Sequence, residues 1–152
     1  MLMKLEVKIN EDIKQAMRTR DTRTLEALRA IKAALLLEKT GKDFHSAEIP
    51  ESVELKLLQK LVKQRRESAA IYTEQGRHEM AEEEIFQAEI IEKYLPQQMD
   101  EEEIRLMVKE IIEISNASNM KDMGRVMGMA TKKAAGKADN ALISKIVRET
   151  LG

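Results

Sequence analysis

Apolar residues recur at intervals of three and four along almost the whole chain, and no strand-like alternation persists for long. Spacings of three and four put side chains on one face of an α-helix, whereas a spacing of two is typical of a strand. The first stripe consists of Leu5, Ile9, Ile13 and Met17. We therefore expect a helix over residues 4–18 that buries this stripe, and an all-α protein.

Capping and turn residues divide the pattern into seven expected helices. Asp21 or Thr22 can cap the second by accepting a hydrogen bond from a free amide N–H group, and Gly41 suits its end. Pro50 suits the first turn of the third. The first four helices cover about residues 4–18, 22–41, 50–75 and 77–94. The fifth helix begins after Asp100, which forms a capping box with Glu103. The sixth begins at a box formed by Asn119 and Asp122 and ends at Gly136, and the seventh begins after Asp139.

Pro96 interrupts the periodic pattern, so we expect a domain boundary there, between residues 1–96 and 97–152. Mostly short loops join the first four helices, which predicts an N-terminal four-helix up-and-down bundle followed by a small three-helix domain. The positions expected to face inward are Leu25, Leu28, Ile31 and Leu35 in the second helix, Leu57, Leu58, Leu61 and Val62 in the third, Ala81, Ile85, Ala88, Ile91 and Leu95 in the fourth, Ile104, Met107, Val108, Ile111 and Ile112 in the fifth, and Leu142, Ile143, Ile146 and Val147 in the last.

Composition narrows the classes of protein that the chain can belong to. Its 152 residues include no cysteine, which excludes a disulfide, a thiolate metal site and a cysteine nucleophile. The longest apolar run, residues 33–37, is far shorter than the roughly 20 residues that cross a bilayer. The first ten residues lack the apolar centre of a signal peptide. We therefore expect a cytoplasmic protein without a membrane partner.

Charge is distributed unevenly although the net charge is only −1. Residues 1–66 carry 15 Lys and Arg against 10 Asp and Glu, or +5, and residues 67–99 carry 2 against 8, or −6. Residues 121–148 carry 7 basic and 2 acidic side chains, or +5. The C-terminal basic stretch is the part whose charge favours a nucleic-acid partner.

No recognisable catalytic or metal-binding pattern is present. The two histidines, His45 and His78, have no partners at metal-ligand spacing, and we expect one in a solvated loop and the other at a helix start. Phosphate-binding glycine loops and a nucleophile elbow are absent. The acidic run 82–84 is typical of a solvated face. We therefore expect no catalytic residue, no cofactor and no metal.

A basic segment and a pair of glycines each have both a structural and a functional interpretation. Lys63, Arg65 and Arg66 are typical of a solvated helix face, but such charges also contact phosphates. Gly124 and Gly128 leave a flat strip on one helix face at a cost of up to about 1 kcal/mol each relative to alanine. Close approach of a neighbouring helix is the more common reason for such residues, and close approach of an RNA backbone is the alternative.

Lysines follow the glycine strip, at Lys132, Lys133 and Lys137, around Gly136. Cations are favoured at a helix C-terminus by the helix dipole, which is the structural interpretation. The functional interpretation is a phosphate-binding rim beside the strip. Lys133 and Lys137 share a face if the helix extends that far.

Several motifs resemble those of the GatB/YqeY family. They are the string 122–128 (DMGRVMG) with 136–139 (GKAD), and upstream the segments 63–68 (KQRRES), 94–96 (YLP) and 99–104 (MDEEEI). The resemblance covers nearly the whole chain. It implies two all-α subdomains and a kinship with tRNA-dependent amidotransferases, in which GatB carries the same tail domain at its C-terminus, whereas nothing here resembles the catalytic parts of those enzymes.

The resemblance implies a module that contacts tRNA, an aminoacyl-tRNA synthetase or an amidotransferase component, and that has no catalytic machinery. Two other hypotheses compete with it: a protein–protein adaptor without RNA contact, and a carbon–nitrogen ligase, which the missing nucleophile–base pair disfavours. The residues expected to contact RNA are Gly124, Arg125, Gly128, Lys132, Lys133, Gly136 and Lys137, with Lys63, Arg65 and Arg66 as a secondary basic patch.

Overall fold

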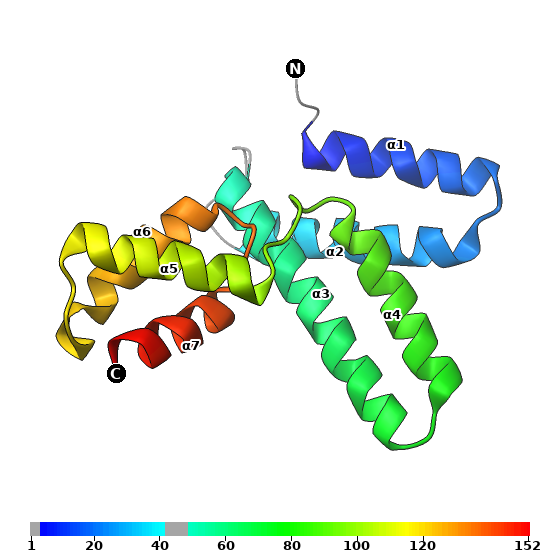
Figure 1. The fold of residues 1–152 in the computed structure, drawn as a ribbon. Helices are drawn as coiled ribbons and strands as arrows, with labels where there is room; N and C mark the ends of the chain where they lie inside the picture. The colour runs from blue at the N-terminus through cyan, green and yellow to red at the C-terminus, as the bar shows by residue number, and fades with distance from the viewer. Residues whose placement is uncertain (1–3, 42–48) are drawn as a thin grey trace. The chain divides into compact units, whose positions relative to one another are not determined.

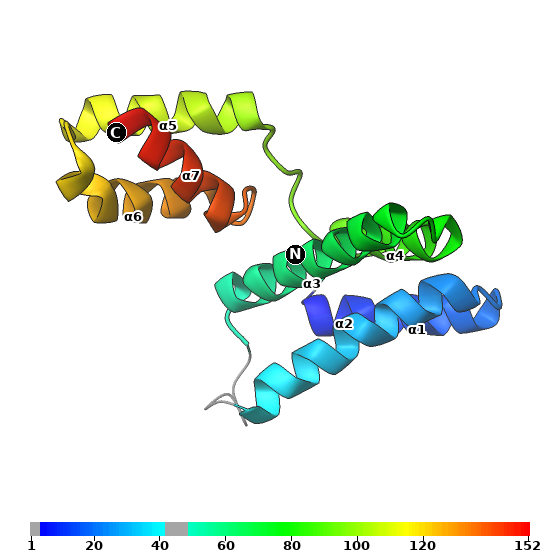
Figure 2. The same cartoon turned by 90° about the horizontal axis from the view of Figure 1, so that it is seen from below.

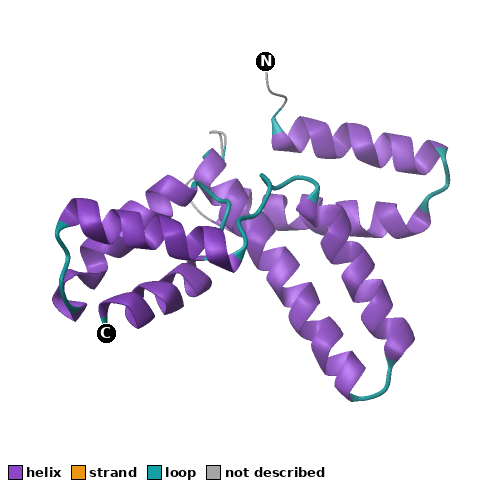
Figure 3. Cartoon of the chain, viewed as in Figure 1, coloured by secondary structure: helices purple, strands orange, loops and turns teal. Residues whose placement is uncertain are grey.

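The computed structural model describes residues 4–41 and 49–152. In these two segments the chain forms seven α-helices, one short 3-10 helix and no strand (Figure 3), which confirms the all-α prediction. The helices are α1 (Leu5–Arg18), α2 (Thr22–Gly41), α3 (Glu51–Glu74), α4 (His78–Glu92), α5 (Glu101–Ser115), α6 (Met123–Ala134) and α7 (Asn140–Leu151), with the 3-10 helix η1 at Met120–Asp122.

The chain divides into two compact units, one that extends to Leu95 and one from Pro96 to Gly152. In the first unit, α1 and α2 form one antiparallel pair and α3 and α4 form another, while α2 also lies against both α3 and α4 (Figures 1 and 2). Burial of aliphatic side chains stabilises this arrangement by roughly 1.5–3 kcal/mol for each fully buried residue. The largest fully buried side chains of this unit are Ile9, Leu28, Ile31, Leu58 and Ile91.

Polar contacts between α2 and α4 supplement this core. Arg23 of α2 forms an ion pair with Glu83 of α4, with 3.0 Å between the guanidinium and the carboxylate. The same guanidinium lies 4.0 Å from the centre of the Phe86 ring, where the negative face of the ring attracts a cation. At the start of α2, Asp21 accepts a hydrogen bond of 3.2 Å from the Thr24 N–H group, as expected of a cap. Hydrogen bonds from the Thr24 side chain and from its N–H group lower the pKa of Asp21.

Two side chains that we expected to be buried are exposed. Met17 is 56% exposed, and Ala16 is buried in its place. Each step of four residues rotates the side chain by 40° about the helix axis, so three steps carry Met17 about 120° away from Leu5. Ile85 is 38% exposed, whereas Ile90 is buried, because α4 packs against two neighbours and its buried positions are spread over two faces.

The second unit has its own core, enclosed by α5, α6 and α7. The predicted capping box at the start of α5 is confirmed. The Asp100 carboxylate accepts a hydrogen bond of 2.8 Å from the Glu103 N–H group, and the Glu103 carboxylate accepts one of 3.3 Å from the Asp100 N–H group. The largest fully buried side chains of this unit are Ile104, Val108, Val126, Ile143, Ile146 and Val147.

The sixth helix differs from its predicted bounds at both ends. Asn119 caps the 3-10 helix, accepting a hydrogen bond of 2.9 Å from the Lys121 N–H group, and α6 begins only at Met123. The helix ends at Ala134, two residues before Gly136, because Ala135 already has a left-handed backbone with φ of 48°. Gly136 continues the turn with φ of 82°, a conformation that glycine adopts without strain.

Candidate nucleic-acid interface

The exposed side of α6 carries most of the residues that were expected to contact RNA. Val126, Ala130 and Ala134 are buried and define the inward side of this helix. On a helix that turns 100° per residue, four of the exposed residues lie together on the opposite side, within an arc of about 100°. These residues are Gly124, Arg125, Gly128 and Lys132, and we call them the α6 outer face.

The glycines of this face have open space beside them. A Cβ atom placed on either Gly124 or Gly128 would have no other atom of the described chain within 4 Å. Neither has a positive φ, so the backbone does not require glycine. The interpretation that a neighbouring helix approaches closely is therefore wrong for the part of the chain that the structure describes. Nothing within the unit offsets the cost of up to about 1 kcal/mol that glycine imposes on a helix.

The cations of the candidate site differ in their surroundings. Arg125 forms an ion pair of 3.1 Å with Asp122, and Lys133 forms one of 3.4 Å with Glu110 of α5. Lys132 and Lys137 are exposed, and within residues 4–41 and 49–152 neither has an ion-pair partner. Lys132 is thus the cation most available to a ligand on the α6 outer face, while Lys133 points toward α5.

Asp122 also accepts a hydrogen bond that holds the segment before α6 in place. Its carboxylate accepts a hydrogen bond of 3.0 Å from the Ser118 N–H group, and this bond, followed by the charge of Arg125, lowers the pKa of Asp122. The carboxylate therefore remains ionised and holds Arg125 beside Gly124 and Gly128, at one end of the outer face.

The turn after α6 positions Lys137. Because the helix ends at Ala134, Lys133 and Lys137 do not share a helical face. The turn is held instead by the segment that precedes α5. The Gln98 side-chain amide donates a hydrogen bond of 3.0 Å to the Gly136 carbonyl, and the Met99 N–H group donates one of 2.8 Å to the Lys137 carbonyl. No sequence pattern indicated these two contacts.

The secondary basic patch lies on α3 and contacts α4. Arg65 donates a hydrogen bond of 3.0 Å to the side-chain carbonyl of Gln87, and Arg66 forms an ion pair with Glu92. Lys63 is exposed on the same helix. Two of the three side chains thus link α3 to α4, a contact that the sequence did not indicate. A phosphate at this position would have to compete with the contacts to Gln87 and Glu92.

The histidines and the acidic side chains are the other candidates for chemistry in this chain. His78 is the exposed first residue of α4, and His45 lies outside the described residues. Within residues 4–41 and 49–152, no group of three or more His, Cys, Asp or Glu side chains could hold a metal ion. In the same segments, no helix is long and apolar enough to cross a membrane.

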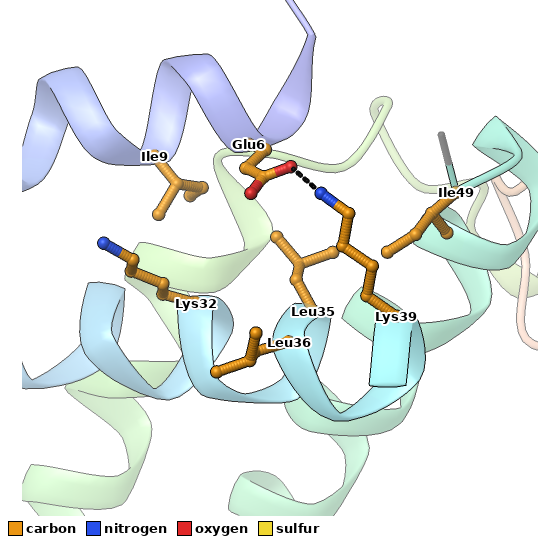
Figure 4. Close-up of a pocket in the computed structure, with 7 residues that line it drawn as sticks. All are labelled: Glu6, Ile9, Lys32, Leu35, Leu36, Lys39 and Ile49. Atoms are coloured by element: carbon orange, nitrogen blue, oxygen red, sulfur yellow. Dashed lines mark hydrogen bonds and ion pairs between the residues drawn. The ribbon is translucent and has the colours of Figure 1, made fainter. Parts of the chain in front are cut away.

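A small pocket lies between α1 and α2, beside Ile49 (Figure 4). Its floor is apolar, and an ion pair of 3.2 Å between Lys39 and Glu6 closes one side. It belongs to the first unit and contains none of the residues of the candidate site. Its lining residues are Glu6, Ile9, Lys32, Leu35, Leu36, Lys39 and Ile49.

Comparison with known proteins identifies relatives of the whole chain and of part of it. The model of the family described as Yqey-like protein matches residues 6–151. "Altered inheritance of mitochondria protein 41, mitochondrial" of Pyrenophora tritici-repentis is 28% identical over 149 residues, an alignment that covers 95% of this chain and 80% of that protein.

A second relative belongs to an amidotransferase. One subunit of the glutamyl-tRNA(Gln) amidotransferase of Thermococcus gammatolerans is 33% identical over 100 residues, an alignment that covers 57% of this chain but only 16% of that protein. The likeness therefore concerns a small part of a much longer protein. Since the family model spans nearly every residue, the chain belongs to the YqeY-like family.

Proposed function

We propose that this protein is a non-catalytic module that docks on tRNA or on the tRNA-charging machinery through the α6 outer face and Lys137. The observation that carries this proposal is the open glycine strip. Gly124 and Gly128 cost the helix stability without any packing gain inside the unit, and cations flank them. A sugar–phosphate backbone that approached the strip closely would gain from both features.

The chemistry of the face suits recognition by shape and charge. Structured RNA is recognised largely through its backbone and groove shape, so few base-reading aromatic side chains are needed. The chain has only two phenylalanines, two tyrosines and no tryptophan. Lys132, Lys137 and Arg125 supply positive charge that can displace counterions from phosphates. The relationship to part of an amidotransferase supports a role near tRNA, since that protein is named for Glu-tRNA(Gln).

The decisive experiment measures tRNA binding by the purified full chain across a range of salt concentrations. The test variant replaces Lys132, Lys133 and Lys137 with alanine. We expect the affinity of the unmodified chain to fall steeply with salt, and the variant to lose about one unit of log–log slope for each phosphate contact removed.

A matched control removes three cations from the first unit, with Lys14, Arg29 and Lys32 replaced by alanine. This control changes the net charge by the same amount but leaves α6 intact. We expect it to retain most of the salt slope. Undetectable binding of tRNA by the unmodified chain, or equal losses in the two triple variants, would contradict the proposal.

Exposed aliphatic side chains favour the second candidate, a protein–protein adaptor that makes no RNA contact. Leu36 and Leu37 of α2 are 61% and 72% exposed. Aliphatic side chains at such exposure occur singly on many surfaces, and they mark an interaction site where they belong to a contiguous apolar patch. An adaptor would bind no tRNA at any salt concentration but would lose its partner when Leu36 and Leu37 are replaced by polar residues.

The place of action also belongs to this proposal. We expect the cytoplasm, where tRNA is charged, while the name of one relative contains the word mitochondrial. Fractionation of cells that express the natural full-length protein distinguishes the two compartments, and recovery in an organelle would contradict a cytoplasmic role.

A further inference from the structure

The solvent-facing side of α5 combines two large aliphatic side chains with carboxylates. Leu106 and Ile114 are 64% and 65% exposed, although α5 supplies four buried residues to the core on its other side. They are eight residues apart, which corresponds to about 12 Å along the helix axis. Glu102, Glu110 and Glu113 are exposed on the same side, and we call these five residues the α5 outer strip.

Ion pairs join α5 to both of its neighbouring helices. Toward α6, Glu110 pairs with Lys133 at 3.4 Å. Toward α7, Arg105 pairs with Glu149 at 2.9 Å and also with Glu101 at 2.8 Å. These two carboxylates raise the pKa of Arg105 and offset its charge, so the nearest arginine does not neutralise the strip.

The charge of the strip determines the kind of partner that fits. Three carboxylates surround Leu106 and Ile114, and Lys109 at the margin is the one exposed lysine of α5. A partner must therefore bring apolar side chains at helical spacing together with positive charge on either side of them. We propose that the α5 outer strip is the docking site for a basic amphipathic helix of a partner protein. Leucine or isoleucine side chains of that helix pack on Leu106 and Ile114, and its lysines or arginines pair with Glu102 and Glu113.

The proposal is independent of RNA binding, because the strip lies on a different helix from the α6 outer face. If both hold, the second unit joins a nucleic acid on α6 to a basic protein segment on α5. If the chain binds no RNA, the strip is still a protein-docking surface. The two proposals are tested with different probes, so either can fail alone.

The probe is a synthetic peptide helix with leucines along one face and lysines along the other. Two controls accompany it: a scrambled peptide of the same composition, and a peptide with glutamate in place of lysine. Binding to the isotope-labelled full chain is followed by amide chemical shifts. We expect the lysine helix to shift the amides of α5 and to bind at least tenfold more tightly than either control.

Variants of the strip identify the contact. Leu106→Asn with Ile114→Asn should weaken binding at least tenfold, and the side chains are exposed enough for the fold to remain. Glu102→Gln with Glu113→Gln should weaken binding and reduce its salt dependence. Ile71→Asn, which changes a 54% exposed isoleucine of α3, should leave binding unchanged.

Three outcomes would overturn the proposal. The first is equal binding of the lysine helix and the scrambled peptide, or no binding of either. The second is concentration-dependent dimerisation that Leu106→Asn abolishes, which would make a second copy of this chain the occupant. The third is protection of the Leu106 and Ile114 methyl groups from a soluble paramagnetic agent in the free protein, which would make the chain's own first unit the occupant.

Discussion

The hydroxyl group of Tyr94 donates a hydrogen bond to Oδ2 of Asp12, a residue 82 positions earlier in the chain. Tyr94 lies just after α4, and Asp12 belongs to α1. Since α1 otherwise packs mainly against α2, this bond ties the first helix to the end of the fourth. Hydrogen bonds to charged groups contribute more to stability than those between neutral groups, about 1.5–3 kcal/mol.

Replacement of Tyr94 by phenylalanine removes this bond and keeps the ring that packs on the core. We expect the free energy of unfolding to fall by about 1.5 kcal/mol, because the partly buried Asp12 carboxylate loses one of its two donors and keeps only Lys8. Urea unfolding followed by circular dichroism measures the change as a lower midpoint with an unchanged slope. Tyr72→Phe serves as the control and should have little effect; equal losses in the two variants would show that the Asp12 contact is not the cause.

The same contact predicts how stability depends on alkaline pH. Burial raises the pKa of Tyr94, and the hydrogen bond to Asp12 raises it further. In the unfolded chain a tyrosine ionises near pH 10, so above this pH the unfolded state loses a proton that the folded state retains. The stabilisation is therefore complete below about pH 10 and is lost as the pH rises toward the folded-state pKa.

Tyrosinate absorbance in the Tyr72→Phe variant tests this directly, because Tyr94 is then the only tyrosine. We expect the absorbance to rise at a clearly higher pH than in the urea-unfolded variant. Coincident titration curves for the folded and unfolded chains would contradict a protected hydroxyl group.

Local signals in the sequence predicted most of the fold. The capping box of Asp100 and Glu103 acts within one turn, so its residues alone indicate the start of α5. The exposure of Met17 depends on how wide a face of α1 is covered by α2, which the spacing of apolar residues in α1 does not indicate. The bond from Tyr94 to Asp12 depends on tertiary packing and has no sequence pattern.

The glycine strip gives a prediction in which stability and binding change in opposite directions. Since a Cβ atom at Gly124 or Gly128 meets open space, alanine at both positions should stabilise the protein. The expected gain is up to about 1 kcal/mol per site, and smaller at Gly124 because it lies in the first turn of α6. If an RNA backbone approaches the strip, the two added methyl groups should weaken tRNA binding at least tenfold.

Gly41→Ala is the matched control for the glycine variants. Gly41 also has open space beside it, but it ends α2 in the first unit. We expect its thermal stability to change by less than that of the double variant and its tRNA affinity to remain the same. A double variant that is more stable and still binds tRNA normally would remove the strip from the interface.

The sequence identified the face of the strip but could not identify its neighbours. A spacing of four residues is sufficient to place Gly124 and Gly128 together. Whether another helix covers them depends on where α5 and α7 pack, which only the structure describes. Similarly, Lys133 and Lys137 would have shared a face only if the helix had extended to Lys137, but Ala135 enters the left-handed region and ends the helix early.

Single lysine variants distinguish a phosphate-binding face from a general excess of charge. Lys132 is exposed on the α6 outer face, whereas Lys133 pairs with Glu110 on the side toward α5. Lys132→Ala should therefore reduce the salt dependence of tRNA binding by about one unit of log–log slope, and Lys133→Ala by clearly less. Both variants lose one charge, so equal reductions would mean that the tRNA senses only the net charge of the unit. A larger effect at Lys133 would place the RNA on the α5 side of the helix, where Glu110 repels phosphate, and that result would contradict the geometry of the proposed interface.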